Sequence, residues 1–245
     1  MRPFTADDIV RVWELGYWQD PAERAVTVLA TAFPEKGGDE LWRLSLGRRN
    51  AHLLGVRERH FGPELNAFSE CANCGAQLEF TLTVGALRVA GAAEATDTEF
   101  RLEAEGFALR FRLLDSLDLR AAAAAPDVGA SRQVLVERCV LEARREGETL
   151  AVEELPEAVI VHLATRLAEC DPQAETLIDL ACPACATAWQ MPFDIASFFY
   201  AEISAQARRL LREVHTLARA YAWRESDILS MSARRRRYYL ELLDQ

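Results

Sequence analysis

Two stretches decide the fold of this chain: Cys71-Ala-Asn-Cys74-Gly75 and Cys182-Pro-Ala-Cys185-Ala186. A Cys-x-x-Cys turn places both sulfurs on one side of a tight loop, and here an apolar or aromatic stretch follows each turn. Together the turns supply four thiolates, the number that a closed tetrahedral zinc site needs. We therefore predict one structural Zn²⁺, bound by Cys71, Cys74, Cys182 and Cys185.

The two turns lie far apart in the sequence. A compact zinc ribbon separates its turns by about 15–20 residues, whereas nearly half of the 245-residue chain lies between Cys74 and Cys182. The intervening chain must leave the ribbon and return, which is tolerated because loop-closure entropy grows slowly with length. We expect a structured insertion at residues 85–175.

Other interpretations of the cysteines compete with a shared zinc site. The two pairs could be unrelated to each other. A thioredoxin-like redox site would place a cysteine at a helix N-terminus, but strands are predicted after Cys74 and Cys185. A deaminase-type catalytic zinc would need a His-x-Glu motif, and none of the four histidines has Glu two residues on. His60 could replace a thiolate, but we interpret it as an ordinary histidine beside a turn.

Alternating apolar residues predict strands next to both turns. Residues 78–84 alternate as a half-buried strand, residues 178–180 lead into the second turn and residues 189–193 leave it. Within the insertion, residues 100–113 alternate on both sides of Glu105-Gly106, which predicts a β-hairpin.

Most of the remaining sequence is predicted to be helical. Thr5 and Asp20-Pro21 are start signals of two helices, and Asp115 or Ser116 and then Pro156 begin helices in the insertion. The longest periodic signal has apolar residues three and four positions apart: Ala196, Phe199, Ile203, Ala207, Leu210, Val214, Leu217 and Tyr221. Its alanines and aromatics suit burial in a core better than a coiled coil.

These patterns predict an α+β fold that is mainly helical, with a small antiparallel zinc-ribbon-like β module carrying a helical insertion. The predicted domains are an N-terminal helical region (1–66), the zinc-knuckle module (67–193) and a C-terminal helical region (194–245). Cys139 and Cys170 fall in helix-like stretches, and we interpret them as small buried hydrophobes.

The composition argues against several classes of function. Lys plus Arg is 28 and Asp plus Glu is 38, a formal charge of −10, which disfavours a nucleic-acid binder that needs a basic face. The first ten residues lack the apolar segment of a signal peptide, and no apolar run is long enough to span a bilayer. We expect a cytoplasmic protein with reduced thiols. Motifs of nucleotide-binding loops, serine hydrolases and zinc proteases are missing from the sequence, so no enzymatic activity is predicted.

One basic run stands out against this acidic background: Arg234, Arg235, Arg236 and Arg237. It could bind phosphate or a partner, or it could be the solvated face of a helix. We favour the second interpretation, in which Leu240, Leu242 and Leu243 anchor the helix and the arginines stay outside.

A further set of stretches, on both sides of the insertion, carries a family resemblance. In the first half they are Leu44-Ser-Leu-Gly-Arg-Arg-Asn50, Arg57-Glu-Arg-His-Phe-Gly-Pro63 and the first cysteine turn with Leu78-Glu-Phe80. In the second half they are Asp171-Pro-Gln173, Leu180-Ala-Cys-Pro-Ala-Cys185, Trp189, Phe193-Asp-Ile-Ala-Ser-Phe198, Leu210-Leu-Arg-Glu-Val-His215, Ala220-Tyr221, Trp223, Asp227-Ile-Leu229 and Arg235-Arg-Arg-Tyr-Tyr-Leu240. These stretches resemble the T4-like baseplate hub assembly chaperones of contractile phages and extracellular contractile injection systems.

The resemblance implies a non-enzymatic protein that assists assembly of a baseplate or central hub, or becomes part of it. Its partners would be baseplate, hub or spike proteins of a contractile tail. Only the four cysteines carry over residue by residue, and Ala186 departs from the glycine that is usual after the second turn. An assembly chaperone, a permanent structural baseplate component and a nucleic-acid-binding zinc ribbon remain as alternatives.

Overall fold

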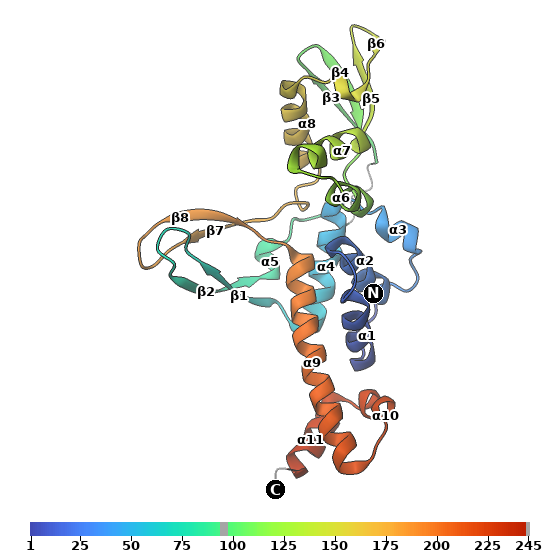
Figure 1. The fold of residues 1–245 in the computed structure, drawn as a ribbon, viewed down its shortest axis with the longest axis vertical. Helices are drawn as coiled ribbons and strands as arrows, with labels where there is room; N and C mark the ends of the chain where they lie inside the picture. Colours follow the sequence, from blue (N-terminus) through green and yellow to red (C-terminus); the bar gives the residue numbers. More distant parts are fainter. Residues whose placement is uncertain (94–97, 244–245) are drawn as a thin grey trace. The chain divides into compact units, whose positions relative to one another are not determined.

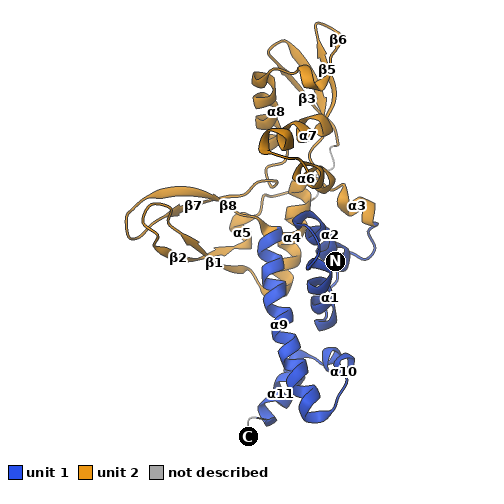
Figure 2. Cartoon of the chain, viewed as in Figure 1, with its two compact units in different colours: residues 1–37, 196–245 blue, residues 38–195 orange. Residues whose placement is uncertain are grey.

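The computed structural model describes residues 1–93 and 98–243. The chain forms two compact units: unit 1 comprises residues 1–37 and 196–245, and unit 2 comprises residues 38–195 (Figure 2). Helices predominate and the sheets are small and antiparallel, which confirms the predicted α+β fold class. Among the described residues, no helix is both long and apolar enough to cross a membrane.

Unit 1 is helical. It contains α1 (Ala6–Gly16), α2 (Pro21–Ala32), α9 (Ile195–Tyr221, of which the first residue belongs to unit 2), α10 (Glu225–Ser230) and α11 (Ala233–Leu243). The predicted caps form: Oγ1 of Thr5 accepts the N–H of Asp8 at 3.1 Å, and Oδ1 of Asp20 accepts the N–H of Glu23 at 2.9 Å. Each cap satisfies a backbone donor that a helix start leaves unpaired.

The long helix α9 buries its apolar face, as its periodicity predicts. Phe199, Ile203, Ala207 and Leu217 have no exposed surface. Further along, Leu210 and Val214 pack with residues of α1 and α10 in the core of unit 1. The alanines and aromatics of this helix therefore serve a globular interior.

Two of the β-hairpins of unit 2, both visible in Figure 1, each surround one cysteine turn. In the first, β1 (Glu64–Glu70) pairs with β2 (Gln77–Thr83). In the second, β7 (Leu177–Ala181) pairs with β8 (Ala188–Pro192). The helix α4 (Leu46–Phe61) follows the short α3 (Gly38–Trp42) and leads into β1. Gly62, with φ +85°, ends α4 in a backbone conformation that favours glycine.

The insertion between the hairpins is itself an α/β body. It contains α5 (Val84–Leu87), β3 (Phe100–Ala104), β4 (Phe107–Phe111), α6 (Ser116–Ala123), α7 (Val128–Cys139), β5 (Val140–Arg145), β6 (Glu148–Thr149), the 3₁₀ turn η1 (Val152–Glu154) and α8 (Glu157–Cys170). Its sheet has the order β3-β4-β5-β6. Apolar residues of β4, α7 and α8, among them Phe111, Val136 and Leu163, form its core. Residues 94–97 of the predicted insertion lie outside the described residues.

The predicted hairpin at Glu105-Gly106 is present. Glu105 and Gly106 have φ of 53° and 77°, and two positive values in succession are typical of the tight hairpin turn that matches strand twist. The same turn conformation recurs between β5 and β6, where Glu146 and Gly147 have φ of 53° and 89°.

Candidate metal centre

The first cysteine turn is held in shape by its backbone. The N–H of Gly75 donates to the carbonyl of Cys71 at 2.8 Å, and the N–H of Cys71 donates to the carbonyl of Ala76 at 2.9 Å. Gly75 has φ +70°, a left-handed conformation without steric penalty for glycine. This turn directs the side chains of Cys71 and Cys74 to the same side.

The second turn repeats this geometry. The N–H of Ala186 donates to the carbonyl of Cys182 at 2.9 Å, and the N–H of Cys182 donates to the carbonyl of Thr187 at 2.8 Å. Ala186 has φ +59°, so an alanine adopts the conformation that Gly75 has in the first turn. A left-handed conformation costs an L-residue roughly 1–2 kcal/mol, and the turn forms despite this cost.

The structure brings all four predicted cysteines together. Their sulfurs lie within 4.8 Å of one another. The Sγ atoms of Cys71 and Cys185 are 3.7 Å apart, and those of Cys74 and Cys182 are 3.6 Å apart. The first cysteine of each turn is thus next to the second cysteine of the other. Cys71 and Cys182 are buried, whereas Cys74 is exposed and Cys185 is intermediate.

These distances fit a tetrahedral metal ion. Zn–S bonds of about 2.3 Å imply sulfurs roughly 3.8 Å apart at the corners of a tetrahedron. The four thiols are free, and a disulfide would need sulfurs about 2.05 Å apart. A soft tetrahedral set of four sulfurs suits zinc or iron among the common metals. The cluster can therefore hold a metal ion, and four protein ligands would close its coordination.

The electrostatics of the cluster also favour a cation. Hydrogen bonds from Thr187 and Asn73 lower the pKa of the Cys185 thiol to about 5. The N–H of Ala76 lowers the pKa of Cys74, but the neighbouring sulfurs outweigh it and raise that pKa to about 12. Several thiolates this close repel one another, and a bound metal ion would remove that repulsion.

Both turns join antiparallel strands, not a strand and a helix, so the redox interpretation lacks its helix N-terminus. Among the described residues, the metal-ligand cluster contains cysteines alone, and His60 is not part of it. Cys139 is buried in the core of the insertion, where burial raises the pKa of its thiol to about 12. Cys170 packs partly buried against the same core. Both fit the interpretation as small hydrophobes.

A polar clasp at the opposite end of the two hairpins has no counterpart in the sequence predictions. In this clasp, the N–H of Gly47 donates to Oδ2 of Asp171 at 2.9 Å, and Nδ2 of Asn50 donates to the carbonyls of Gln173 and Ala174, both at 3.1 Å. A Cβ atom at Gly47 would overlap Oδ1 of Asp171. The clasp fixes the start of α4 to the chain that leads into β7.

Gln173 extends the clasp to the first hairpin. Its side chain accepts the N–H of Val89 at 2.6 Å and donates to the carbonyl of Leu87 at 3.0 Å and to Oγ1 of Thr176 at 3.2 Å. Leu87 closes α5, directly after β2, and Thr176 directly precedes β7. The hairpins are therefore joined by the clasp at their bases and by the cysteines at their turns. Asn50 and Gln173 both lie in stretches that carry the family resemblance. That resemblance is the feature of the sequence that could have indicated the clasp.

The interpretation of the basic run needs a correction. Arg236 is only 4% exposed, its Nε donates to Oε2 of Glu213 at 2.9 Å, and its Nη1 donates to the carbonyl of Met231 at 2.5 Å. Of the three predicted anchors, Leu240 packs against the core of unit 1, whereas Leu242 and Leu243 are exposed. Arg236 faces the core of unit 1 because it shares a helix face with the packed Tyr239 and Leu240. The other three arginines of the run are exposed, as predicted.

The fold and the cluster together define an α+β protein in which two hairpins bring four cysteines together, compatible with a zinc-ribbon-like module. A family model described as "T4 bacteriophage base plate protein" matches residues 18–200, which include all four cysteines and the clasp. The chain belongs to this baseplate family, and this confirms the resemblance seen in the sequence. Neither the curated proteins nor the solved structures gave a significant match.

Proposed function

We propose that this chain is a non-enzymatic, zinc-binding protein that assists assembly of the baseplate or central hub of a contractile phage tail or injection system. The observation that carries the proposal is the match of residues 18–200 to the baseplate family. Membership of that family implies contacts with other baseplate and tail proteins. Hub or spike proteins are the specific partners proposed, and the cytoplasm is the proposed place of assembly.

A structural metal supports a role in binding rather than in catalysis. Four cysteine ligands leave no open position for water or substrate, which catalytic zinc sites keep. Zinc is the proposed ion at Cys71, Cys74, Cys182 and Cys185. Metal analysis of freshly purified, reduced protein should find about one zinc per chain, released when the thiols are modified. Iron at that stoichiometry, with its visible absorption, would contradict zinc, and a metal-free protein would contradict the site.

The assembly role predicts a transient association. Mass spectrometry of finished, purified particles should not detect the chain, whereas tagged chain from cells that are making tails should co-purify with baseplate proteins. A fixed stoichiometry in finished particles would instead support the alternative, a permanent structural component.

A nucleic-acid-binding zinc ribbon is the least supported alternative, given the net charge of −10. A DNA- or RNA-binding protein would lose affinity steeply as salt rises. A salt titration with duplex DNA and single-stranded RNA should show no such specific binding. The three-part division at residues 66/67 and 193/194 also remains a proposal, which limited proteolysis can examine.

A further inference from the structure

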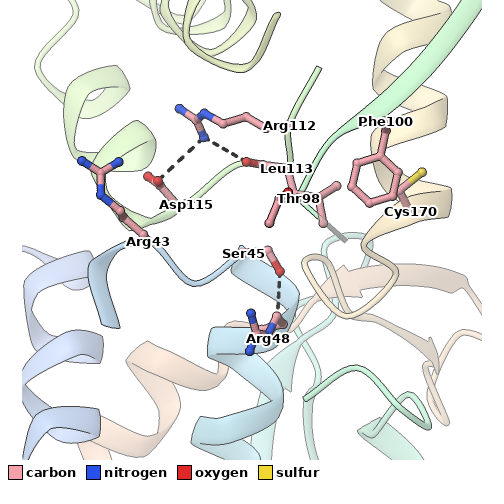
Figure 3. A pocket seen from close by; sticks show the side chains of 9 residues that line it. All are labelled: Arg43, Ser45, Arg48, Thr98, Phe100, Arg112, Leu113, Asp115 and Cys170. Atoms are coloured by element: carbon pink, nitrogen blue, oxygen red, sulfur yellow. Dashed lines mark hydrogen bonds and ion pairs between the residues drawn. The ribbon is translucent and has the colours of Figure 1, made fainter. Parts of the chain in front are cut away.

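Unit 2 contains a second site-like feature, a pocket of about 260 Å³ (Figure 3). Its walls come from the α3–α4 connection, from the start of β3, from the chain between β4 and α6, and from the end of α8. We call it the arginine pocket because Arg43, Arg48 and Arg112 line it. Phe100 and Leu113 supply apolar wall.

The charges of the pocket are unbalanced. Among the described residues that line it, three are arginines and one, Asp115, is acidic. Arg112 is neutralised by the buried Asp118, to which it donates two hydrogen bonds of 2.7 and 2.9 Å. In the part of the chain that the structure describes, Arg43 and Arg48 have no acidic partner within 4.0 Å. Asp171 attracts Arg48 electrostatically from a longer distance, so Arg43 carries the least compensated charge among the described lining residues.

Arg48 has a second unusual property. Its Nε is buried and lacks a hydrogen-bond partner, and no other buried side-chain nitrogen or oxygen of the described residues shares this state. A buried donor without a partner is unfavourable. The neighbouring polar positions of its motif are already engaged: Ser45 caps α4, and Arg49 bonds to Asn50 and Ser116. Arg48 is therefore the member of this stretch that keeps an unpaired, buried hydrogen-bond donor.

The lining favours a carboxylate over a phosphate. Phosphate sites commonly use free N–H groups at a helix start, but at the start of α4 these groups are bonded to Leu114, Asp171 and Ser45. The carboxylate of Asp115 also opposes a dianion. A single carboxylate on an aliphatic stem could place its charge at Arg43 and Arg48 and its stem against Phe100.

We propose that the arginine pocket receives an acidic side chain of a protein partner, held by Arg43 and Arg48. The proposal rests on the proposed function in one respect, that the partner is a protein of the tail. Arginine forks match carboxylates in geometry as well as in charge. The pocket would thus be a specific anchor point within a larger contact.

The binding chemistry can be tested without the partner. The ¹⁵N–¹H signals of the arginine Nε groups are followed during titration of the full chain with N-acetylglutamate methylamide. The matched neutral probe is N-acetylglutamine methylamide, and inorganic phosphate is a separate arm. We expect a saturable shift of the Arg48 signal with the glutamate compound alone. No saturable shift, an equal response to the glutamine compound, or tighter binding of phosphate would overturn the proposal.

Two variants locate the binding. Arg48→Gln should weaken binding of the glutamate compound roughly tenfold or more, as expected for loss of a hydrogen bond to a charged group, with the Arg43 signal as readout. Arg101→Gln removes an exposed arginine of β3 outside the pocket and should leave binding unchanged. If Arg48→Gln fails to fold, comparing the glutamate and glutamine compounds on the wild-type chain still tests whether the pocket binds a carboxylate.

Co-purification separates this proposal from the assembly role. Wild-type chain should recover tail proteins from cells making tails, and the Arg43→Gln, Arg48→Gln double variant should recover clearly less. Equal recovery by both chains would refute the pocket as an anchor but leave the assembly role intact. Recovery of no tail protein by wild type would contradict the assembly role, while the titration would still report on the pocket.

Discussion

Replacing Cys182 by serine should abolish binding of the proposed metal and uncouple the two hairpins at their turns. Cys182 is 2% exposed, its Sγ lies 3.6 Å from that of Cys74, and its N–H holds the second turn. Serine keeps the turn but is a poor ligand for a soft metal ion. The clasp at Gln173 still joins the hairpin bases, so the variant should fold with lower stability.

The size of the loss in folding stability follows from the linkage between metal binding and folding. Structural zinc in zinc-finger peptides binds with about 10–16 kcal/mol at pH 7, and a free zinc concentration of about 1 μM offsets about 8 kcal/mol. Zinc should therefore stabilise the folded chain by roughly 2–8 kcal/mol under these conditions. Preformed sulfurs, all within 4.8 Å, favour the upper part of that range. The melting temperature should change by at least roughly 4–8 °C.

The assay is thermal unfolding followed by circular dichroism in zinc buffers of defined free concentration. Wild-type stability should rise by about 1.4 kcal/mol for each tenfold increase in free zinc, and a chelator should remove the gain. The Cys182→Ser variant should be less stable than the wild type, and its stability should depend neither on the free zinc concentration nor on the chelator. Cys170→Ala, which changes a cysteine outside the cluster, should keep the full zinc dependence. A wild-type chain without zinc dependence, or a serine variant that retains it, would refute the reasoning.

Three further predictions concern the surrounding structure. Gly47→Ala should destabilise the protein by about 1–3 kcal/mol in urea unfolding, because its Cβ would overlap a carboxylate oxygen; Gly55→Ala in the same helix, with its nearest contact at 3.7 Å, should stabilise it by roughly 0.5–1 kcal/mol. Arg236→Ala should cost about 1–3 kcal/mol, since it leaves buried hydrogen bonds unmade, whereas the exposed Arg237→Ala should stay within about 0.5 kcal/mol; equal effects would contradict the burial. Burial alone would raise the pKa of Asp118, but hydrogen bonds from two arginines and a backbone N–H lower it below its ordinary value. Its stabilisation is thus complete above the unfolded pKa of about 3.9 and is lost as pH falls toward the lower folded pKa; Asp118→Asn should flatten this acid limb of a stability–pH curve, and an unchanged limb would exclude the assignment.

The features that the sequence predicts well are local in origin. The turn at Glu105-Gly106, the cap at Thr5 and the start at Asp20-Pro21 each depend on a few neighbouring residues. The periodicity of residues 196–221 depends on one helix face meeting a core. The cysteine cluster is the one well-predicted feature that joins residues far apart in the sequence. It could be predicted because soft metal ligands in two Cys-x-x-Cys turns leave few other structural explanations.

The strands β1 and β5 are missing from the sequence predictions for physical reasons. In β1 the alternation is weak, because Leu65 is buried but the large Phe68 is 77% exposed. Strand β5 begins at Val140 directly after α7 ends at Cys139, without the glycine or proline that would mark the change. Tertiary pairing with β4, not local preference, decides its conformation.

The clasp and the buried Arg236 could not be predicted for a different reason. Asn50 bonds to residues more than 120 positions away, and hydrogen bonds of this kind leave no periodic trace in a sequence. Arg236 belongs to a run of four identical residues, so composition cannot distinguish the buried one. Which arginine turns inward is set by the helix face that it shares with the packed Tyr239 and Leu240.

The wide spacing of the cysteines has a consequence for synthesis on the ribosome. Cys182 is translated 108 residues after Cys74, a delay of roughly 5–20 s at about 5–20 residues per second. Throughout that interval the nascent chain offers a metal ion two thiolates where the finished site has four. The first hairpin and the insertion must therefore emerge before the site can close, and secure capture of the proposed metal would be a late event in the life of each new chain.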